Sequence, residues 1–310
     1  MHNRTNAPPA REHLVRAYLL LLLMVLFWGA NFSVAKVALA SVPPLVFNAL
    51  RFPCAAIAVW IVLRLRGPIP WPAPQDYSRI LVIALLGNVL YQLFFIFGLD
   101  ATNAGIASVL LAGSPILTAL LSAAMGHERV QLRTWVGVFA TFVGILLVVQ
   151  ASGGMSAGGA TTTGALLMVA ASASWAMFTV GARPLLVRYG PTAVTAWTLW
   201  AGTAVLVAIG ARQVMTLPAG VLTPAVWGAI LYAGALSIGI SYLIWYHAVS
   251  IIGNTRTATF SNAVPAVALF IAWIWLGEVP TAGALTGSAI IIGGVALAQS
   301  RRAAISSRHE

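Results

Sequence analysis

The chain has 310 residues, of which 60% are hydrophobic and only 7% are charged, and its mean hydropathy is +0.92. Soluble domains carry roughly a quarter charged residues, so this composition excludes a water-exposed globular surface and favours a lipid environment. The net charge is +11, but the basic residues lie in short connections between apolar runs, which indicates membrane orientation rather than nucleic-acid binding. The single cysteine, Cys54, excludes an intrachain disulfide. We expect no metal site and no cofactor.

Ten apolar segments follow one another along the chain, separated by charges, prolines and glycines. Each is long enough for a helix to cross about 30 Å of hydrocarbon, and a helix satisfies its own backbone hydrogen bonds in lipid. The segments cover about 16–37, 43–64, 78–99, 103–125, 132–150, 163–182, 191–211, 224–247, 255–276 and 281–300. The sequence therefore predicts an all-α integral membrane protein with ten transmembrane helices.

The basic residues predict the orientation of these helices. If the N-terminus is cytoplasmic, only Lys36 and Arg212 of the 17 basic residues fall on the outer side, and Arg51 falls within a segment. All the others fall on the inner side, as the positive-inside rule requires. Both termini are therefore predicted to be cytoplasmic.

The second half of the chain repeats the first. Residues of the same kind correspond at nearly constant spacing: Trp28 with Trp175, Lys36 with Arg183, Pro44 with Pro191, Pro115 with Pro265, and Glu128 with Glu278. Each half holds five segments, an odd number, so the second half must enter the membrane from the opposite side. Secondary transporters with such inverted repeats bind substrate near the midplane, between the repeats.

The repeat divides the chain into five parts. We predict a cytoplasmic tail over 1–15, a first five-helix repeat over 16–150, an external linker over 151–162, a second five-helix repeat over 163–300 and a cytoplasmic tail over 301–310.

Polar and aromatic side chains share one helix face in the third segment and again in the eighth. They recur at i, i+3, i+4 and i+7, the spacing of one helical face. The positions are Asn88, Tyr91, Gln92 and Phe95, which correspond to Ile238, Ser241, Tyr242 and Trp245. Lipid does not stabilise amides and hydroxyls, so these faces are predicted to point inward. Two interpretations are open, a substrate cavity and hydrogen bonds between helices, and we favour the cavity.

The fourth and ninth segments combine small residues with a proline. The small-residue face holds Gly105, Ser108 and Ala112 before Pro115, and its counterpart holds Thr255, Ala258 and Asn262 before Pro265. A proline inside a helix removes one backbone hydrogen bond and kinks it. Pro115 and Pro265 are thus either the hinges of a gate or static kinks. The fifth and tenth segments hold glycines and no central ionisable group, which indicates packing scaffold.

Charged residues are informative by their positions. Arg51 is a costly charge inside a segment, and it either holds a substrate carboxylate or is satisfied by Asn48, backbone carbonyls or the interface. Lys36 and Arg183, at opposite mouths, are expected to attract anionic groups. No carboxylate lies in the middle of a segment, so we expect facilitative transport or coupling through a group that the sequence does not identify.

Several motifs together resemble those of a known family. They are Phe27-Trp28-Gly29-Ala30-Asn31-Phe32 with Lys36, Asn48-Ala49-Leu50-Arg51-Phe52, and Pro115 with Glu128, echoed by Ser174-Trp175-Ala176, Pro265 and Leu276-Gly277-Glu278. The chain resembles the ten-helix, EamA-type carriers of the drug/metabolite transporter superfamily. The second copy departs from the first, because Phe178 stands in place of Asn31 and Thr198 in place of Arg51. This departure argues against a strictly symmetric site.

The resemblance implies a basket of helices around a central cavity, with the fifth and tenth spans at its periphery. It also implies export of amino acids or related metabolites through the inner membrane of a bacterial cell. A lining of rings and amides suits a zwitterion with an apolar or aromatic side chain. The candidate cavity residues are Trp28, Asn31, Arg51, Asn88, Tyr91, Gln92, Trp175, Ser241, Tyr242, Trp245 and Asn262.

The predicted function is an alternating-access carrier for neutral or aromatic amino acids or similar small metabolites. Its expected partners are a small-molecule substrate and the lipid bilayer, with no nucleic acid, and we expect a monomer. A multidrug, nucleobase or other metabolite carrier of the same fold is the alternative. A membrane enzyme would need a catalytic set at one depth, and a channel would need rings of charge or carbonyls. The sequence offers neither.

Overall fold

The computed structural model describes residues 11–67, 69–125, 132–151, 160–252, 257 and 260–299, and these residues form helices and connections but no strand. Most of both predicted tails and of the predicted linker lies outside the described residues. The same is true of three predicted positions, Glu128, Thr255 and Ala258.

The helices of the first half follow the predicted segments closely. They are α1 (Arg11–Leu39), α2 (Pro44–Arg66), α3 (Tyr77–Ala84), α4 (Tyr91–Asp100), α5 (Ala104–Leu111), α6 (Ser114–Ala124) and α7 (Leu132–Ala151). A 3-10 turn, η1 (Pro74–Asp76), precedes α3. A π-helical segment, η2 (Leu85–Leu90), joins α3 to α4, so that residues 74–100 form one continuous rod.

The second half has the same plan. Its helices are α8 (Ala160–Gly181), α9 (Arg183–Tyr189), α10 (Pro191–Met215), α11 (Pro224–Leu231), α12 (Ser241–Ile252), α14 (Val264–Leu276) and α15 (Ala282–Gln299). A second π-helical segment, η3 (Tyr232–Ile240), joins α11 to α12. The two π segments lie in the third and eighth predicted spans, at corresponding positions of the two halves. The short helix α9 was not predicted.

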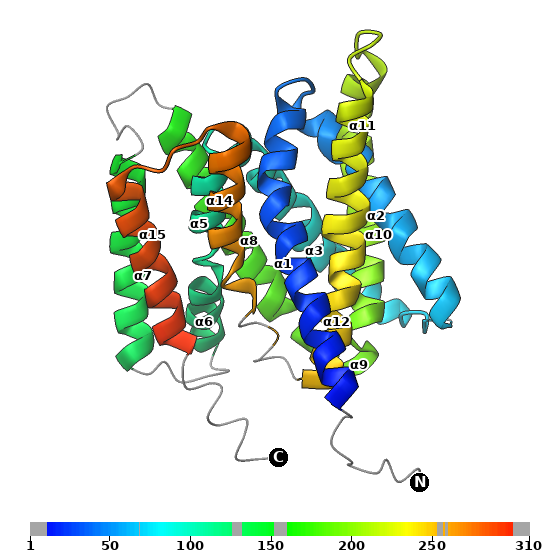
Figure 1. Ribbon diagram of the computed structural model, residues 1–310. Coiled ribbons are helices and arrows are strands. Elements are labelled where there is room, and N and C mark those ends of the chain that lie inside the picture. Colours follow the sequence, from blue (N-terminus) through cyan, green and yellow to red (C-terminus); the bar gives the residue numbers. More distant parts are fainter. Residues whose placement is uncertain are drawn as a thin grey trace.

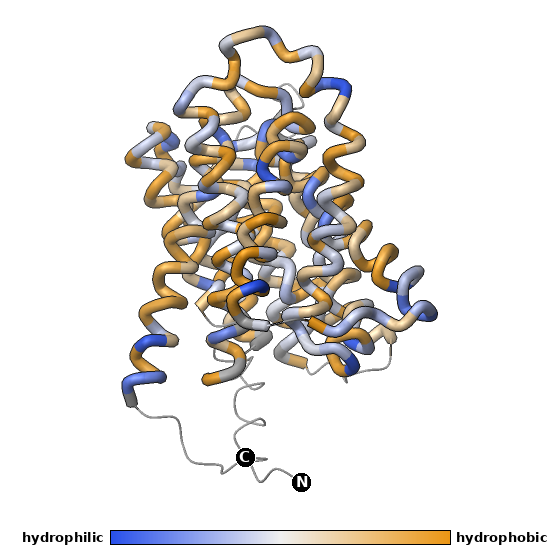
Figure 2. Tube along the Cα trace, turned by 90° about the vertical axis from the view of Figure 1, so that its right-hand side faces the viewer, coloured by the Kyte–Doolittle hydropathy of each residue, from blue (hydrophilic) through white to orange (hydrophobic). Residues whose placement is uncertain are grey.

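Eight helical stretches are long and apolar enough to cross a membrane within the described residues. Two shorter apolar helices, Val264–Leu276 and Ala282–Leu297, lie where the ninth and tenth spans are predicted. Hydrophobic residues dominate along the helices in Figure 2. The all-helical membrane architecture is confirmed, whereas the total of ten crossings stays a prediction.

The two ends of the helix bundle can be told apart by the chain itself. Helix α1 begins and α15 ends at the lower end in Figure 1, which we call the terminal end. The end at which α1 finishes, near Leu39, is the opposite end.

Packing between the two halves of the chain dominates the bundle. Helix α2 packs on α10, α7 on α15, and α5 on α14. Helices α1 and α2 both pack against η3 of the second half, and α8 and α10 both pack against η2 of the first half. Each polar third or eighth span is therefore seated against the first two helices of the other half. A two-fold relation between the halves produces this reciprocal arrangement.

Pro115 and Pro265 lie in the first turns of their helices, each after a turn of the chain. Helix α5 ends at Leu111, and α6 starts at Ser114 with Pro115 in its first turn. In the same way, Pro265 lies in the first turn of α14, after a turn at Asn262 and Ala263. Proline has no backbone N–H, and the first turn of a helix is where none is needed. The fourth span thus contains a turn at residues 112–113, where the kink was expected.

Helices α7 and α15 form a tight pair at one edge of the bundle (Figure 1). A methyl group added to Gly144 would lie 2.7 Å from the carbonyl oxygen of Gly287, and one added to Gly287 would lie 2.8 Å from that of Gly144. Glycine is therefore needed on both sides of this contact. Large side chains on α7, such as Trp135, Phe139 and Phe142, are exposed. The pair matches the predicted scaffold role.

Candidate functional site

Aromatic rings from both halves meet between α1, α4, α8 and α12. The ring of Trp28 on α1 stacks on that of Trp245 on α12, with centroids 5.8 Å apart. The Trp28 Nε1 also donates a hydrogen bond of 2.9 Å to the carbonyl oxygen of Ser237 in η3. On the other side, the rings of Tyr91 on α4 and Trp175 on α8 lie 5.1 Å apart. Each of these two pairs joins one predicted residue from each half.

Phe95 connects these rings to α1 and α2. Its ring lies 6.0 Å from that of Tyr91 and 5.6 Å from that of Phe32. Asn31, next to Phe32, is 7% exposed, and its Oδ1 atom has no hydrogen-bond partner. A buried acceptor without a donor is costly, so this amide oxygen has unused hydrogen-bonding capacity.

Arg51 lies in a buried polar cluster between α2 and α4. Its side chain is 1% exposed. The Nε atom donates to Asn48 Oδ1 at 3.0 Å, and Nη2 donates to Gln92 Oε1 at 2.7 Å. The Nδ2 atom of Asn48 donates in turn to the Gln92 carbonyl oxygen at 3.2 Å. The predicted bond from Arg51 to Asn48 is present, and Gln92 is a second acceptor.

The rings of Phe47, Phe52 and Phe95 surround the Arg51 guanidinium, with centroids 5.0, 5.7 and 5.7 Å from Cζ. The π segment η3 also comes close to Arg51. A methyl group at Gly234 would collide with the Arg51 carbonyl oxygen, so only glycine lets η3 approach α2 there. The guanidinium is thus enclosed by rings and amides at the junction of the two halves.

The predicted polar face of the third span is divided among three neighbours. Tyr91 contacts Trp175 on α8, and Gln92 contacts Arg51 on α2. Asn88 lies in η2, against Gly202 of α10. The π segment changes the rotation per residue, and the α-helical spacing used for the prediction did not allow for it.

Three other predicted positions differ in their surroundings. Ser241 is fully buried, and its hydroxyl donates to the carbonyl oxygen of Leu236 in its own helix at 2.9 Å. Tyr242 packs against the cluster around Phe52, and Asn262 lies in the turn before α14. The contacts found for Ser241 and Tyr242 thus lie with Leu236 and with the cluster around Phe52.

Two charged side chains close the opposite end of the bundle. The Nζ atom of Lys36 donates to the carbonyl oxygens of Leu99, Asp100 and Thr102 at 2.8, 2.8 and 2.7 Å. These carbonyls lie at the C-terminal end of α4, where a cation is favoured. Lys36, expected to attract anionic groups, instead binds the end of a helix.

Glu278 completes this arrangement from the second half. Its Oε1 accepts from Ala104 N at 3.0 Å and its Oε2 from Gly105 N at 3.1 Å, at the N-terminus of α5. Gly277, at a left-handed φ of 68°, ends α14 and leads the chain to Glu278. We call Lys36 and Glu278 the opposite-end clamp. The sequence placed both residues at span ends but gave no sign that they bracket one turn.

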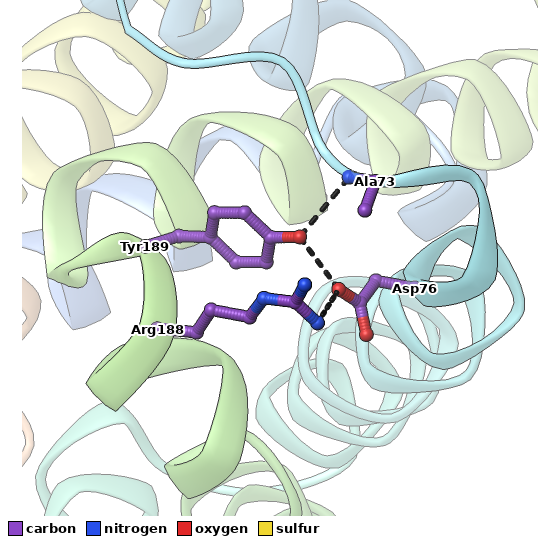
Figure 3. A network of polar contacts seen from close by, with 4 residues as sticks. All are labelled: Ala73, Asp76, Arg188 and Tyr189. Atoms are coloured by element: carbon purple, nitrogen blue, oxygen red, sulfur yellow. Dashed lines mark hydrogen bonds and ion pairs between the residues drawn. The ribbon is translucent and has the colours of Figure 1, made fainter.

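A separate polar network joins the halves at the terminal end (Figure 3). Asp76 Oδ2 accepts from Arg188 Nη1 at 2.9 Å and from the Tyr189 hydroxyl at 2.6 Å. The Tyr189 hydroxyl accepts in turn from Ala73 N at 3.0 Å. This network ties the connection before α3 to α9, and sequence reasoning missed it because α9 was not foreseen.

Comparison with protein families identifies the family of this chain. The sequence model described as the EamA-like transporter family matches residues 15–150 and again 162–299. The chain belongs to the EamA-like transporter family. The family was expected from the motifs around Trp28, Arg51 and Pro115, and it is confirmed.

Relatives of this EamA-like protein are described as transporters. A "probable terminal-alkyne amino-acid exporter" of Streptantibioticus cattleyicolor is 30% identical, over 93% of this chain and 95% of its own. An "uncharacterized transporter" of Archaeoglobus fulgidus is 26% identical, over 93% of this chain and 100% of its own. A "probable amino-acid metabolite efflux pump" of Salmonella typhimurium is 27% identical, over 89% and 92%.

A solved structure supports the fold of the EamA-like chain. It is 21% identical, covers 91% of this chain and 95% of its own, and superposes with a TM-score of 0.65. The family and the relatives' names indicate a membrane transporter rather than an enzyme.

Proposed function

We propose that this EamA-like protein exports neutral amino acids, in particular aromatic ones, or closely related metabolites by alternating access. Two observations support this substrate class. Rings from both halves meet in the pairs Trp28–Trp245 and Tyr91–Trp175, and two relatives are described as exporters of amino acids or their metabolites. The paired rings carry the proposal, because they offer aromatic surface where the two halves join.

A zwitterion would be held by complementary groups in this region. Its side chain would stack on the rings, and its ammonium would donate to the unpartnered Oδ1 of Asn31 or lie over a tryptophan face. The small molecule is the proposed partner, and the protein acts as a monomer in the bilayer.

The opposite-end clamp supports the alternating-access part of the proposal. Lys36 and Glu278 come from different halves, and both bind the turn between α4 and α5. Opening of this end would separate them from that turn. The terminal end faces the cytoplasm of a bacterial cell in this proposal, because the basic residues Arg64, in the last turn of α2, and Arg79, in the first turn of α3, follow a crossing from the opposite end. Of the described basic residues, Lys36 and Arg212 lie in the last turns of α1 and α10, at the opposite end.

Counterflow in proteoliposomes tests the proposed function. Vesicles preloaded with unlabelled L-phenylalanine should take up labelled L-phenylalanine faster and further than vesicles loaded with buffer, and uptake should saturate. Protein-free liposomes are the control. Linear, non-saturable flux would indicate a channel. Exchange of ethidium or uracil without exchange of any amino acid would contradict the substrate class but keep the carrier.

A further inference from the structure

We propose that Arg51 makes the binding region selective for substrates that carry a carboxylate and unfavourable for organic cations. This inference rests on the proposed carrier function and deepens it, because it states which charge the substrate must bear. It starts from the burial of Arg51, its lack of a counter-ion and its position close to the ring pair Tyr91–Trp175.

Arg51 is an ionised group deep within a membrane helix. It lies in the second candidate span, Pro44–Leu65, and is 1% exposed. Removal of such a charge from water is expensive, and charges inside spans are retained for function more often than for stability. The corresponding residue in the second half is Thr198, which is neutral and donates its hydroxyl hydrogen to Val194 O within its own helix. The second half therefore does not need a charge at this depth.

No carboxylate compensates the Arg51 charge in the described part of the chain. The one ion pair found there joins Arg188 to Asp76, at the terminal end. The acceptors of Arg51 are the neutral amide oxygens of Asn48 and Gln92. These bonds use two of the five guanidinium N–H groups, so donors remain for a further acceptor. Hydrogen bonds and ring contacts offset part of the burial cost but leave the positive charge in place.

This positive charge lies close to one of the two ring pairs, Tyr91–Trp175. Phe95 contacts both the guanidinium and Tyr91, with its ring 5.7 Å from Arg51 Cζ and 6.0 Å from the ring of Tyr91. A ligand bound against Tyr91 would therefore feel the field of the guanidinium from the side of Phe95.

Charges act more strongly in such a region than they do in water. In a low-dielectric surrounding, an uncompensated cation attracts an anionic group and repels a cationic one over several ångströms. A carboxylate could also replace the Gln92 amide as a bidentate partner of the guanidinium fork. Both effects favour a carboxylate at the end of the substrate nearest to α2, and both oppose a substrate that is only a cation.

The first test uses the wild-type protein and four ligands that differ in charge around one phenyl ring. L-phenylalanine, 3-phenylpropanoate, 2-phenylethylamine and L-phenylalaninamide compete for counterflow of labelled L-phenylalanine in proteoliposomes. We expect the two carboxylates to compete at least about tenfold better than the amine and the amide. Equal competition by the two cations would overturn the inference and leave the carrier function intact. Absence of exchange with any carboxylate would overturn both.

The second test changes the charge. In Arg51→Gln the preference for carboxylates over cations should fall at least about tenfold, whereas Arg51→Lys, which keeps the charge, should retain most of it. Arg64→Gln is the matched control, because Arg64 is exposed near the end of the same helix, over the ring of Trp60. Its preference should equal that of the wild type.

Folding is checked by gel filtration and thermal unfolding in detergent. A folded Arg51→Gln variant with an unchanged ligand preference would show that Arg51 is purely structural, and the inference would be wrong. If Arg51→Gln does not fold, the ligand preference of Arg51→Lys and that of the wild type decide whether the inference holds. Loss of the preference in a folded Arg51→Lys would contradict a role for the charge itself.

Discussion

Asn31 combines a buried amide with an oxygen that accepts no hydrogen bond. Leucine has a similar size and no polar group, so Asn31→Leu should remove the cost of the unpaired oxygen. We expect it to raise the free energy of unfolding by about 1–3 kcal/mol. It should also weaken transport at least about tenfold if this oxygen receives the substrate ammonium. Thermal unfolding in detergent and counterflow kinetics measure the two effects.

Ser33 provides the control for Asn31 on the same helix. Its hydroxyl is also buried and unpartnered, but Ser33 lies four residues from Gly29, which packs on Val267 of α14. Ser33→Ala should therefore keep normal transport. A lower melting temperature in Asn31→Leu would mean that the amide has a stabilising partner, and normal transport would remove Asn31 from the site.

The role of Trp245 in transport can be tested by a single substitution. Trp245→Ala removes the stack on Trp28 and the surface offered to the substrate, so transport efficiency should fall roughly tenfold to hundredfold. Trp273→Ala makes the same change on the exposed face of α14, where Trp273 is 51% exposed, and should have little effect. Initial counterflow rates over a range of substrate concentrations compare the two. Similar rates in both variants would place Trp245 outside the site.

The sequence predicted some of these residues better than others. Trp28 and Trp175 could be found because a tryptophan at the same place in both halves is hard to explain by composition. Ser241 could not be assessed, since whether a hydroxyl serves a ligand or its own backbone depends on the π segment, which has no periodic signal. The bond between Arg51 and Gln92 joins residues from different helices and was equally invisible in a single sequence.

At the scale of helices, the opposite-end clamp joins four elements through two side chains. Lys36→Met removes three hydrogen bonds from a charged donor, each worth about 1.5–3 kcal/mol. We expect this end to open more often. A cysteine introduced at Thr102, which is 3% exposed in the closed state, should then react with a polar maleimide about tenfold faster or more.

The labelling experiment is done after Cys54, the single native cysteine, has been changed to serine. Arg212→Gln is the control, since Arg212 is the other basic residue at this end and is exposed. It should not change the labelling rate. Identical rates in Lys36→Met and the parent protein would mean that the clamp does not hold this end closed.

Two glycines of α15 have different surroundings, so the same substitution is expected to change the stability differently at each. A methyl at Gly287 would lie 2.7 Å from Val148 Cγ2 and 2.8 Å from Gly144 O, whereas a methyl at Gly293 would meet no atom within 4 Å. Gly287→Ala should lower the free energy of unfolding by about 1–3 kcal/mol. Gly293→Ala should leave it unchanged or raise it by up to about 1 kcal/mol. Thermal unfolding in detergent compares them, and equal stability would argue against tight packing of α7 on α15.

The positions of the helices followed from the sequence because a lipid environment imposes their length and composition. The breaks in the helices and the irregular turns could not be predicted from the sequence. Pro115 marks the right place in the fourth span, but whether a proline bends or ends its helix depends on the packing of Ala112 and Gly113 before it. The clamp was missed for another reason, because Lys36 and Glu278 meet only after the two halves have assembled.

For the whole molecule, the distribution of charge predicts its orientation. We expect Ala219→Cys, in the exposed connection after α10 at the opposite end, to react with a membrane-impermeant maleimide in intact cells. Pro70→Cys, exposed at the terminal end, should react only after the membrane is opened. Both are made in the Cys54→Ser background. The reverse pattern would invert the proposed topology.

The reciprocal packing of the two halves has a consequence for biosynthesis. At about 5–20 residues per second, the second half leaves the ribosome roughly 8–30 s after the first. During this interval α2, α5 and α7 lack their partners from the second half, because α10, α14 and α15 are not yet made. The close-packing surface around Gly144 then faces lipid, and Arg51 lacks the cover of η3. We therefore expect the half-made protein to be exposed to membrane proteases and to need insertion chaperones, and its yield to depend on how quickly translation passes the midpoint of the chain.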